Sequence, residues 1–228
     1  MNSRTDIPHP KRTLAVILIT LLACGAMALV DGVWMPHYFV KSAVKLALFL
    51  LLPLLYARFD RDVKLRGLFR FHKRGVAAAL ILGGSIYAFL LGGYFVLRGV
   101  FDFSGVASSL SQNAGVTADN FIFVALYISL INSALEEFFF RGFVFRNLLD
   151  RGAPLAYLFS SAAFALYHIA MMIGWFSLPL TALIILGLIV GGVIFNALNQ
   201  HFGTLYVSWA VHMFANFAIN TIGFILLL

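Results

Sequence analysis

Two adjacent carboxylates and an arginine lie inside an otherwise apolar stretch of this chain, Leu130–Gly152, and no other feature constrains its fold as strongly. The chain is 62% hydrophobic, and an acidic side chain inside a membrane costs about 2.5 kcal/mol or more. Glu137 precedes Arg141 by four positions, a favourable spacing for an ion pair on one helix face, whereas Glu136 faces Phe140 at that spacing. The pattern predicts that Glu137 pairs with Arg141, and that Glu136 has no local cation and remains available. The open alternative is that both glutamates are solvated at a helix end.

The composition predicts an all-α fold, a polytopic transmembrane helix bundle. Only 11% of the 228 residues are charged, which excludes an ordinary soluble domain. We expect one integral membrane domain over 1–228, with a motif-bearing core at about 120–220. The net charge is +7, but the basic residues lie in short segments between apolar runs, so we expect membrane lipids and no nucleic acid as partners. The single cysteine, Cys24, excludes an internal disulfide and a cysteine cluster for metal.

Seven apolar runs are long enough to cross a bilayer as helices. They cover roughly 13–30, 41–57, 75–97, 120–150, 155–173, 178–197 and 204–227. We expect the first to be a retained helix rather than a signal peptide. Lys41 and Lys45 lie near the start of the second run, so we expect both to snorkel towards the interface. In the third run, Gly84, Ala88 and Gly92 form a row of small residues that predicts close contact with another helix.

The distribution of basic residues predicts a cytoplasmic N-terminus. With seven spans, this orientation leaves thirteen Lys and Arg residues inside and three outside. Seven of the thirteen lie in 58–74, a segment that we expect to lie at the lipid headgroups. The Ser-rich segment 101–119 is then a non-cytoplasmic loop, partly re-entrant. The acidic stretch comes to the cytoplasmic side of a multi-pass protein of the cell membrane.

Two histidines, His168 and His212, lie inside expected spans and are the candidates for a site shared with the glutamates. The fourth and fifth spans form a hairpin at Gly152, and Glu137 and His168 both lie fifteen positions from it, about 22 Å along each helix. These two residues are therefore level. His212 reaches the same depth if the hairpin tip projects from the membrane. The alternative is that the two histidines are unrelated structural groups.

The last span carries a polar stripe that lipid would not tolerate, so it must face the bundle interior or water. The stripe consists of Ser208, His212, Asn216 and Asn220. Three helices thus bring a glutamate, two histidines and an asparagine to one point, which suits hydrolysis of an amide. Glu136 and a neutral His168 would hold and deprotonate a water, while His212 and Asn216 would donate hydrogen bonds to the oxyanion.

Three alternatives remain open at this point. Glutamate and two histidines also form a known zinc site, although the usual HExxH spacing is absent. A non-catalytic membrane protein, such as an immunity or partner-binding factor, would keep the same residues for stability. A proton or cation transporter would use Glu136 and His168 as a relay, but no repeat of inverted halves is evident in the sequence.

Three motifs follow one another on three helices. They are EExxxR at Glu136, Glu137 and Arg141, FxxxH at Phe164 and His168, and HxxxN at His212 and Asn216. In this order the motifs resemble the CPBP family of CAAX prenyl endopeptidases and bacteriocin-processing membrane proteases, also called Abi, over about 132–216. The resemblance implies a glutamate-type intramembrane endopeptidase that opens to the cytoplasm, requires no cofactor or metal, and cuts a peptide or protein substrate.

The resemblance also implies a role for each motif residue. Glu136 matches the catalytic glutamate, His168 the histidine that shares its water, His212 and Asn216 the oxyanion-stabilising pair, Glu137 and Arg141 the structural ion pair, and Phe164 the packing residue of its motif. The chain has one expected span fewer than the eukaryotic CAAX enzymes, so the resemblance does not fix a prenylated substrate. Bacterial members are linked to peptide maturation, immunity to bacteriocins and surface-protein sorting.

Overall fold

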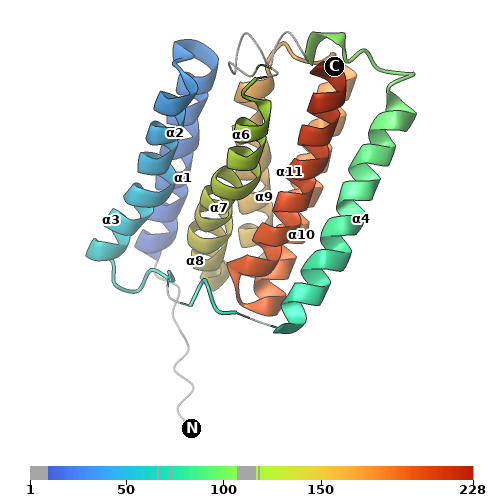
Figure 1. Cartoon of the computed structure of the whole chain (residues 1–228). Helices are drawn as coiled ribbons and strands as arrows, with labels where there is room; N and C mark the ends of the chain where they lie inside the picture. The colour runs from blue at the N-terminus through green and yellow to red at the C-terminus, as the bar shows by residue number, and fades with distance from the viewer. Residues whose placement is uncertain (1–9, 66, 72, 107–116, 118, 228) are drawn as a thin grey trace.

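The computed structural model describes residues 10–65, 67–71, 73–106, 117 and 119–227, which form a bundle of helices (Figure 1). Within these residues there is no strand, and seven helices are long and apolar enough to cross a membrane. They are Pro10–Trp34, Phe39–Phe59, Lys73–Leu97, Phe121–Arg151, Ala153–Met172, Leu178–Phe202 and Leu205–Leu227. The all-helical fold with seven spans, predicted from composition and run length, is confirmed. The cytoplasmic N-terminus stays a prediction.

The first two spans each change helix type along their length. The first is α1 (Pro10–Leu29), which continues as the π-helical turn η1 (Val30–Trp34). The second consists of α2 (Tyr38–Leu46), the π-helical turn η2 (Ala47–Leu51) and α3 (Leu52–Phe59). The third span is α4, a regular α-helix whose bounds are those of the span, Lys73–Leu97.

The fourth span is the longest, and about half of it is π-helical. Its segments are α6 (Phe121–Leu126), η3 (Tyr127–Asn132), α7 (Ser133–Glu136), η4 (Glu137–Phe145), α8 (Arg146–Leu148) and the 3₁₀ turn η5 (Leu149–Arg151). Single π-helical turns are frequent at functional sites, and here a nine-residue π-helical segment begins at the second of the two adjacent glutamates. The sequence pattern gave no indication of this wider winding.

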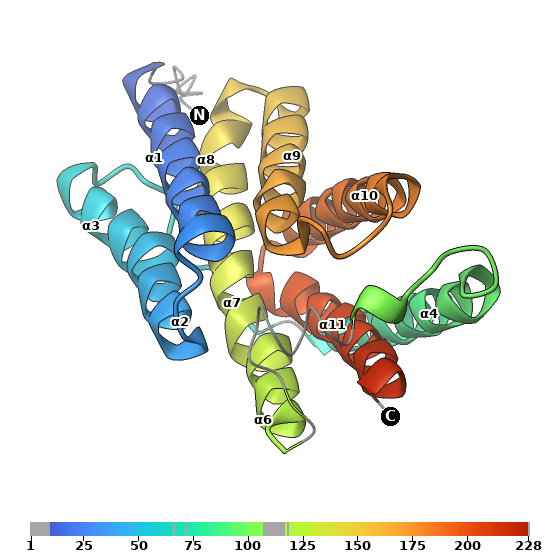
Figure 2. The same ribbon diagram turned by 90° about the horizontal axis from the view of Figure 1, so that it is seen from above.

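The fourth and fifth spans form the predicted hairpin. Gly152 connects them with a φ of 122°, a backbone conformation that favours glycine, and α9 (Ala153–Met172) begins at the next residue. The last two spans are α10 (Leu178–Phe202) and α11 (Leu205–Leu227). Viewed from above, the fourth span runs through the middle of the bundle, between α1–α3 on one side and α9–α11 on the other, while α4 lies outermost beside α11 (Figure 2).

The core of the bundle is built around the phenylalanines of the fourth span. Phe139, Phe140 and Phe143 have no exposed surface, and the Phe139 ring stacks on that of Phe49 in η2 with 4.3 Å between centroids. Aromatic side chains bury a large apolar area and prefer such offset contacts. These contacts fix the rotation of the central helix, and with it the direction in which each glutamate points.

Close packing of α4 depends on Gly83, not on the predicted row of small residues. A Cβ atom at Gly83 would lie 2.3 Å from Cδ2 of Phe214 in α11, whereas one at Gly84 or Gly92 would meet nothing within 4 Å. The predicted row was therefore wrong: it faces away from the neighbouring helix. The register was missed because the spacing of small residues does not show which of two adjacent glycines points inward.

Part of the basic segment 58–74 packs into the end of the bundle instead of lying only at the headgroups. The carbonyl of Leu68 accepts hydrogen bonds from the Leu205 amide (2.8 Å) and the Thr204 hydroxyl (3.2 Å), at the start of α11. Asp60 binds Arg12 of α1 at 2.9 Å. The segment thus ties α1 and α11 to one end of the bundle. Most of the expected re-entrant loop, 101–119, lies outside the described residues.

Candidate active site

Glu136 ends α7 and is 1% exposed, and one of its carboxylate oxygens is held by two donors. Oε1 lies 2.5 Å from Nζ of Lys45, which comes from α2, and accepts a hydrogen bond from Nδ2 of Asn132 at 3.0 Å. The Lys45 ammonium also donates to Oδ1 of Asn132. Lys45, Asn132 and Glu136 therefore form a closed triangle of hydrogen bonds that occupies Oε1.

The other oxygen, Oε2, faces the two histidines. It lies 3.8 Å from Nε2 of His168 and 3.6 Å from Nε2 of His212. Polar atoms at these separations are too far apart for a direct hydrogen bond, and a bridging water is the usual link. Oε2 and the two imidazoles thus surround a point where a small polar molecule would contact all three.

Each histidine is oriented by its other ring nitrogen. Nδ1 of His168 donates to the carbonyl of Phe164 at 2.7 Å, and Nδ1 of His212 donates to Oε1 of Glu137 at 3.0 Å. Because Nδ1 carries the proton in both rings, Nε2 of a neutral ring presents a lone pair towards Glu136. Nε2 of each ring and Oε2 of Glu136 therefore face one another.

The structure contains the ion pair that the sequence predicts between Glu137 and Arg141. Nη1 of Arg141 lies 3.2 Å from Oε1 of Glu137, and both side chains are almost fully buried. The guanidinium also lies over two ring faces, 4.3 Å from the centroid of Phe164 and 4.9 Å from that of Phe195. An arginine buried in this way is stabilised by its counter-ion and by cation–π contacts together.

Phe164 joins the ion pair to the histidines. Besides its contact with Arg141, its ring meets that of His168 edge-on at 4.6 Å and that of His212 at 5.7 Å. Phe195 of α10 stacks on His212 at 4.9 Å. These rings form the wall that holds both imidazoles in place, which is the packing role expected for Phe164.

The polar stripe of α11 faces the fourth span, as predicted. Nδ2 of Asn216 donates to the carbonyl of Ile128 at 3.2 Å, and Asn220 donates to the carbonyl of Ala125 and to the hydroxyl of Ser129. Among the interactions of the described residues, none joins Asn216 to Glu136. The structure thus places Asn216 one turn from His212 on the same helix face, and its oxyanion role stays a prediction.

One expectation about charge was wrong. Lys45 does not snorkel: it is 5% exposed and supplies Glu136 with a cation from another helix. The error arose because helix spacing reports only neighbours on the same helix, whereas this contact joins residues 91 positions apart.

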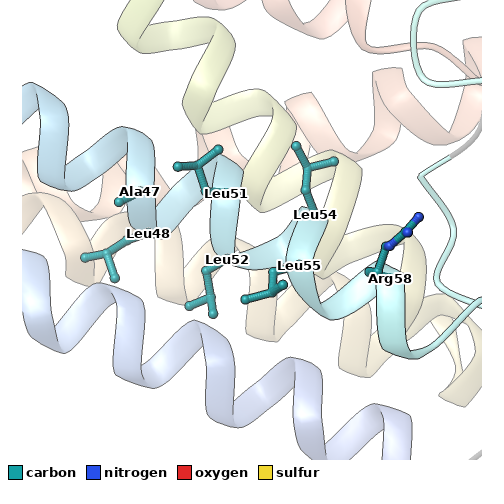
Figure 3. A pocket seen from close by; sticks show the side chains of 7 residues that line it. All are labelled: Ala47, Leu48, Leu51, Leu52, Leu54, Leu55 and Arg58. Atoms are coloured by element: carbon teal, nitrogen blue, oxygen red, sulfur yellow. The ribbon is translucent and has the colours of Figure 1, made fainter.

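The hollow in Figure 3 is not the candidate site. It has a volume of ≈ 680 Å³ and lies along the second span. Its lining is Ala47, Leu48, Leu51, Leu52, Leu54, Leu55 and Arg58. None of these residues belongs to the buried polar cluster, and a leucine surface of this kind suits contact with lipid tails. The hollow offers no group that could move a proton, so the buried polar cluster around Glu136 remains the candidate site.

A second apolar hollow, of ≈ 390 Å³, borders the helix that carries Glu136. Its lining is Leu50, Leu54, Phe69, Ile131, Ala134, Leu135 and Phe138. It lies between the second span, the segment after it and the fourth span. Because Leu135 immediately precedes Glu136, this hollow brings an apolar surface next to the polar cluster.

The fold and the cluster together define a polytopic membrane protein with a buried glutamate–histidine site between its spans. A family model described as type II CAAX prenyl endopeptidase Rce1-like matches residues 118–218. This match confirms the resemblance found in the three motifs and supports CAAX-type intramembrane protease function at the level of the family. No curated protein and no solved structure matches the chain.

Proposed function

We propose that the chain is an intramembrane endopeptidase of the CAAX prenyl protease and bacteriocin-processing type, which hydrolyses a peptide bond near the cytoplasmic leaflet. Its nucleophile is a water activated by Glu136 and His168. The observation that carries the proposal is the division between the two oxygens of Glu136: Oε1 is occupied by Lys45 and Asn132, while Oε2 faces both histidines at 3.6 and 3.8 Å.

The site residues divide the steps of hydrolysis as follows. The water donates one hydrogen to Oε2 of Glu136 and the other to Nε2 of His168, which leaves an oxygen lone pair for the substrate carbonyl carbon. As the C–O bond forms, Glu136 takes a proton. It then delivers this proton to the leaving amine when the C–N bond breaks. General acid–base catalysis of this kind is worth about 10²–10⁴-fold.

The oxyanion is stabilised from α11 in this proposal. His212 donates from Nε2, which requires a proton there in addition to the one on Nδ1, so the ring acts as an imidazolium. Asn216 has a second amide hydrogen besides the one directed at the Ile128 carbonyl, and this hydrogen is its donor. Donors aimed at the developing charge are worth about 10²–10³-fold each.

No metal takes part in the proposed reaction. The charge of the site gives a physical reason, because the Lys45 ammonium already lies 2.5 Å from the Glu136 carboxylate and would repel a divalent cation bound to it.

The substrate is a peptide or protein with an apolar, membrane-associated part. The ≈ 390 Å³ hollow beside Leu135 has an entirely apolar lining and borders the helix of Glu136. A lipid-linked or strongly apolar segment bound there would bring the adjoining peptide bond to the polar cluster. The same apolar surface would exclude bulk water from the reaction.

The test uses purified protein in detergent, a farnesylated CaaX peptide, the same peptide without the lipid, and a library of unmodified peptides, with products read by mass spectrometry. Glu136→Gln should abolish cleavage, while the control Asp31→Asn changes another buried carboxylate, one paired with Lys41, and should retain it. Cleavage by Glu136→Gln at the rate of the unmodified protein would contradict the mechanism.

A second candidate, a non-catalytic immunity or partner-binding protein, is favoured by the Lys45–Glu136 pair itself. A glutamate that is fully buried and fully paired on one oxygen also satisfies the needs of a structural ion pair. In that case Glu136→Gln would lower the thermal stability and leave the cellular phenotype unchanged. Absence of cleavage of every peptide by the unmodified protein would favour this candidate.

A further inference from the structure

Lys45 belongs to α2, outside the segment 118–218 that matches the family model, yet it makes the shortest contact to Glu136. We infer that Lys45 is a positioning residue for hydrolysis: by holding Oε1 of Glu136, it keeps Oε2 turned towards His168 and His212. This inference rests on the proposed function, because it assigns to Lys45 a part in the same site.

The geometry requires donors that fix the plane of the carboxylate. The two oxygens are chemically equivalent, but the terminal torsion of a glutamate side chain is broad, so a carboxylate without such donors would turn out of the orientation in which one oxygen faces the histidines. Lys45 and Asn132 together donate to Oε1 from two directions. A partial rotation of the carboxylate would break both hydrogen bonds inside the bundle, where no solvent replaces them.

Lys45 is itself held in place. Its side chain is 5% exposed, and its ammonium lies 4.9 Å from the ring centroid of Tyr167 and 5.5 Å from that of Phe49. The Tyr167 ring in turn contacts that of His168 at 4.9 Å. Lys45 therefore joins α2, α7 and α9 at the position where Glu136 and His168 must be held relative to each other, and a flexible surface lysine would not do so.

The charges around Glu136 are balanced in pairs. Glu136 faces Lys45 from α2, His168 from α9 and His212 from α11, while its neighbour Glu137 faces Arg141 and His212. Each buried carboxylate thus has one permanent cation. Loss of Lys45 would leave Oε1 with the Asn132 amide as its donor, and the carboxylate could then turn out of the position in which Oε2 faces the two imidazoles.

The chain offers a matched control on the same helix. Lys41 lies one turn before Lys45, is 14% exposed, and pairs at 3.6 Å with Asp31, which is 5% exposed. This second lysine–carboxylate pair also joins α2 to the first span. Removing it tests what the loss of an ion pair at the same end of α2 does while the contact between Lys45 and Glu136 remains.

The experiment measures kcat and KM on the peptide that the unmodified protein cleaves, for Lys45→Met, Lys45→Gln, Lys45→Arg and the control Lys41→Met with Asp31→Asn. Thermal unfolding and size-exclusion profiles are recorded for each. Lys45→Met should lower kcat about 10–100-fold, the effect of a misplacement of about 1 Å, while KM changes less than about threefold. Lys45→Arg should recover part of the lost kcat because it restores a cationic donor.

The variant Glu136→Gln, measured in the same assay, distinguishes a failure of the inference about Lys45 from a failure of the proposed protease function. If Glu136→Gln is inactive and Lys45→Met keeps the kcat of the unmodified protein, the positioning role is overturned and the protease proposal stands. Equal losses in Lys45→Met and in the control would also overturn it, because they would show a general loss of stability. If Lys45→Met does not fold, Lys45→Gln decides, since it removes the charge and shortens the side chain. An unchanged kcat of Lys45→Gln would contradict the inference, and a lowered kcat that Lys45→Arg partly restores would support it.

Discussion

His212 donates from Nδ1 to Oε1 of Glu137 at 3.0 Å, and the same carboxylate oxygen lies 3.2 Å from Arg141. The structural ion pair and the candidate active site are therefore joined through one atom. A change in the charge of Glu137 therefore has two effects. It removes the counter-ion of Arg141, and it removes the acceptor that orients the imidazole of His212.

Glu137→Gln should destabilise the protein strongly. The substitution leaves the fully buried guanidinium of Arg141 without a counter-ion, and breaking a buried pair from one side costs about 3–5 kcal/mol. Thermal unfolding in detergent should show a clear loss, and the double variant Glu137→Gln with Arg141→Met should regain part of it because no unpaired charge remains. Unchanged unfolding of the single variant would contradict a structural role for the pair.

Gly83→Val should destabilise the packing of α4 on α11, while Gly84→Val should have little effect. A Cβ atom at Gly83 would overlap the Phe214 ring, whereas the adjacent position is open. Overpacking of a filled contact typically costs about 1–3 kcal/mol. The two variants have the same composition, so the difference in their melting temperatures measures the contact. Equal melting temperatures of the two variants would show that the Phe214 ring does not pack against Gly83.

The stability of the bundle end should fall in acid through Asp60. Partial burial acts to raise the pKa of this carboxyl, but hydrogen bonds from the Arg12 side chain and the Asp62 amide lower it, and the net pKa is below its ordinary value of about 3.9. Asp60 therefore contributes stability that is fully present above about pH 4 and is lost as the pH falls through its lowered pKa in the folded protein.

Asp60→Asn tests this contribution. Because the pair lies near the surface, its contribution should be at most about 1 kcal/mol. The variant should melt at a lower temperature than the unmodified protein near neutral pH, and the two melting curves should converge as the pH falls below about 4. A difference that stays constant down to pH 3 would show that the ionised carboxylate is not what stabilises this end.

Chelators should leave the proposed activity intact. The permanent charge of Lys45 beside Glu136 disfavours a divalent cation at the site. We therefore expect less than about 0.1 equivalent of zinc in the purified protein by elemental analysis, and unchanged cleavage after treatment with 1,10-phenanthroline. Loss of cleavage that is restored by added zinc would support the zinc alternative instead.

The features that sequence predicts well here are those carried by a single helix or by two consecutive ones. Run length gives the seven spans, the four-residue spacing of Glu137 and Arg141 gives their ion pair, and the hairpin at Gly152 gives the common level of Glu137 and His168. Each of these follows from the rise per residue of a helix and from the cost of polar groups in lipid.

The features that the sequence did not reveal depend on how separate helices are rotated against one another. From the sequence alone, Lys45 is interpreted as a snorkelling lysine, because its contact with Glu136 depends on how α2 packs beside α7. Gly83 and Gly84 are likewise equivalent in the sequence, and the position of α11 shows that Gly83 is the one at the contact. The π-helical winding that begins at Glu137 also has no local signature. The first of these features sets a contact of Glu136, and the other two concern the packing and winding of the helices.

The contact between the second span and the central helix limits how this protein can be recombined with its relatives. A chimaera that kept residues 118–218 and took its leading helices from another member would lose the lysine unless the donor supplied one at the matching depth. Whether such a chimaera is active should therefore depend more on a lysine at the position of Lys45 than on the overall sequence similarity of the exchanged helices.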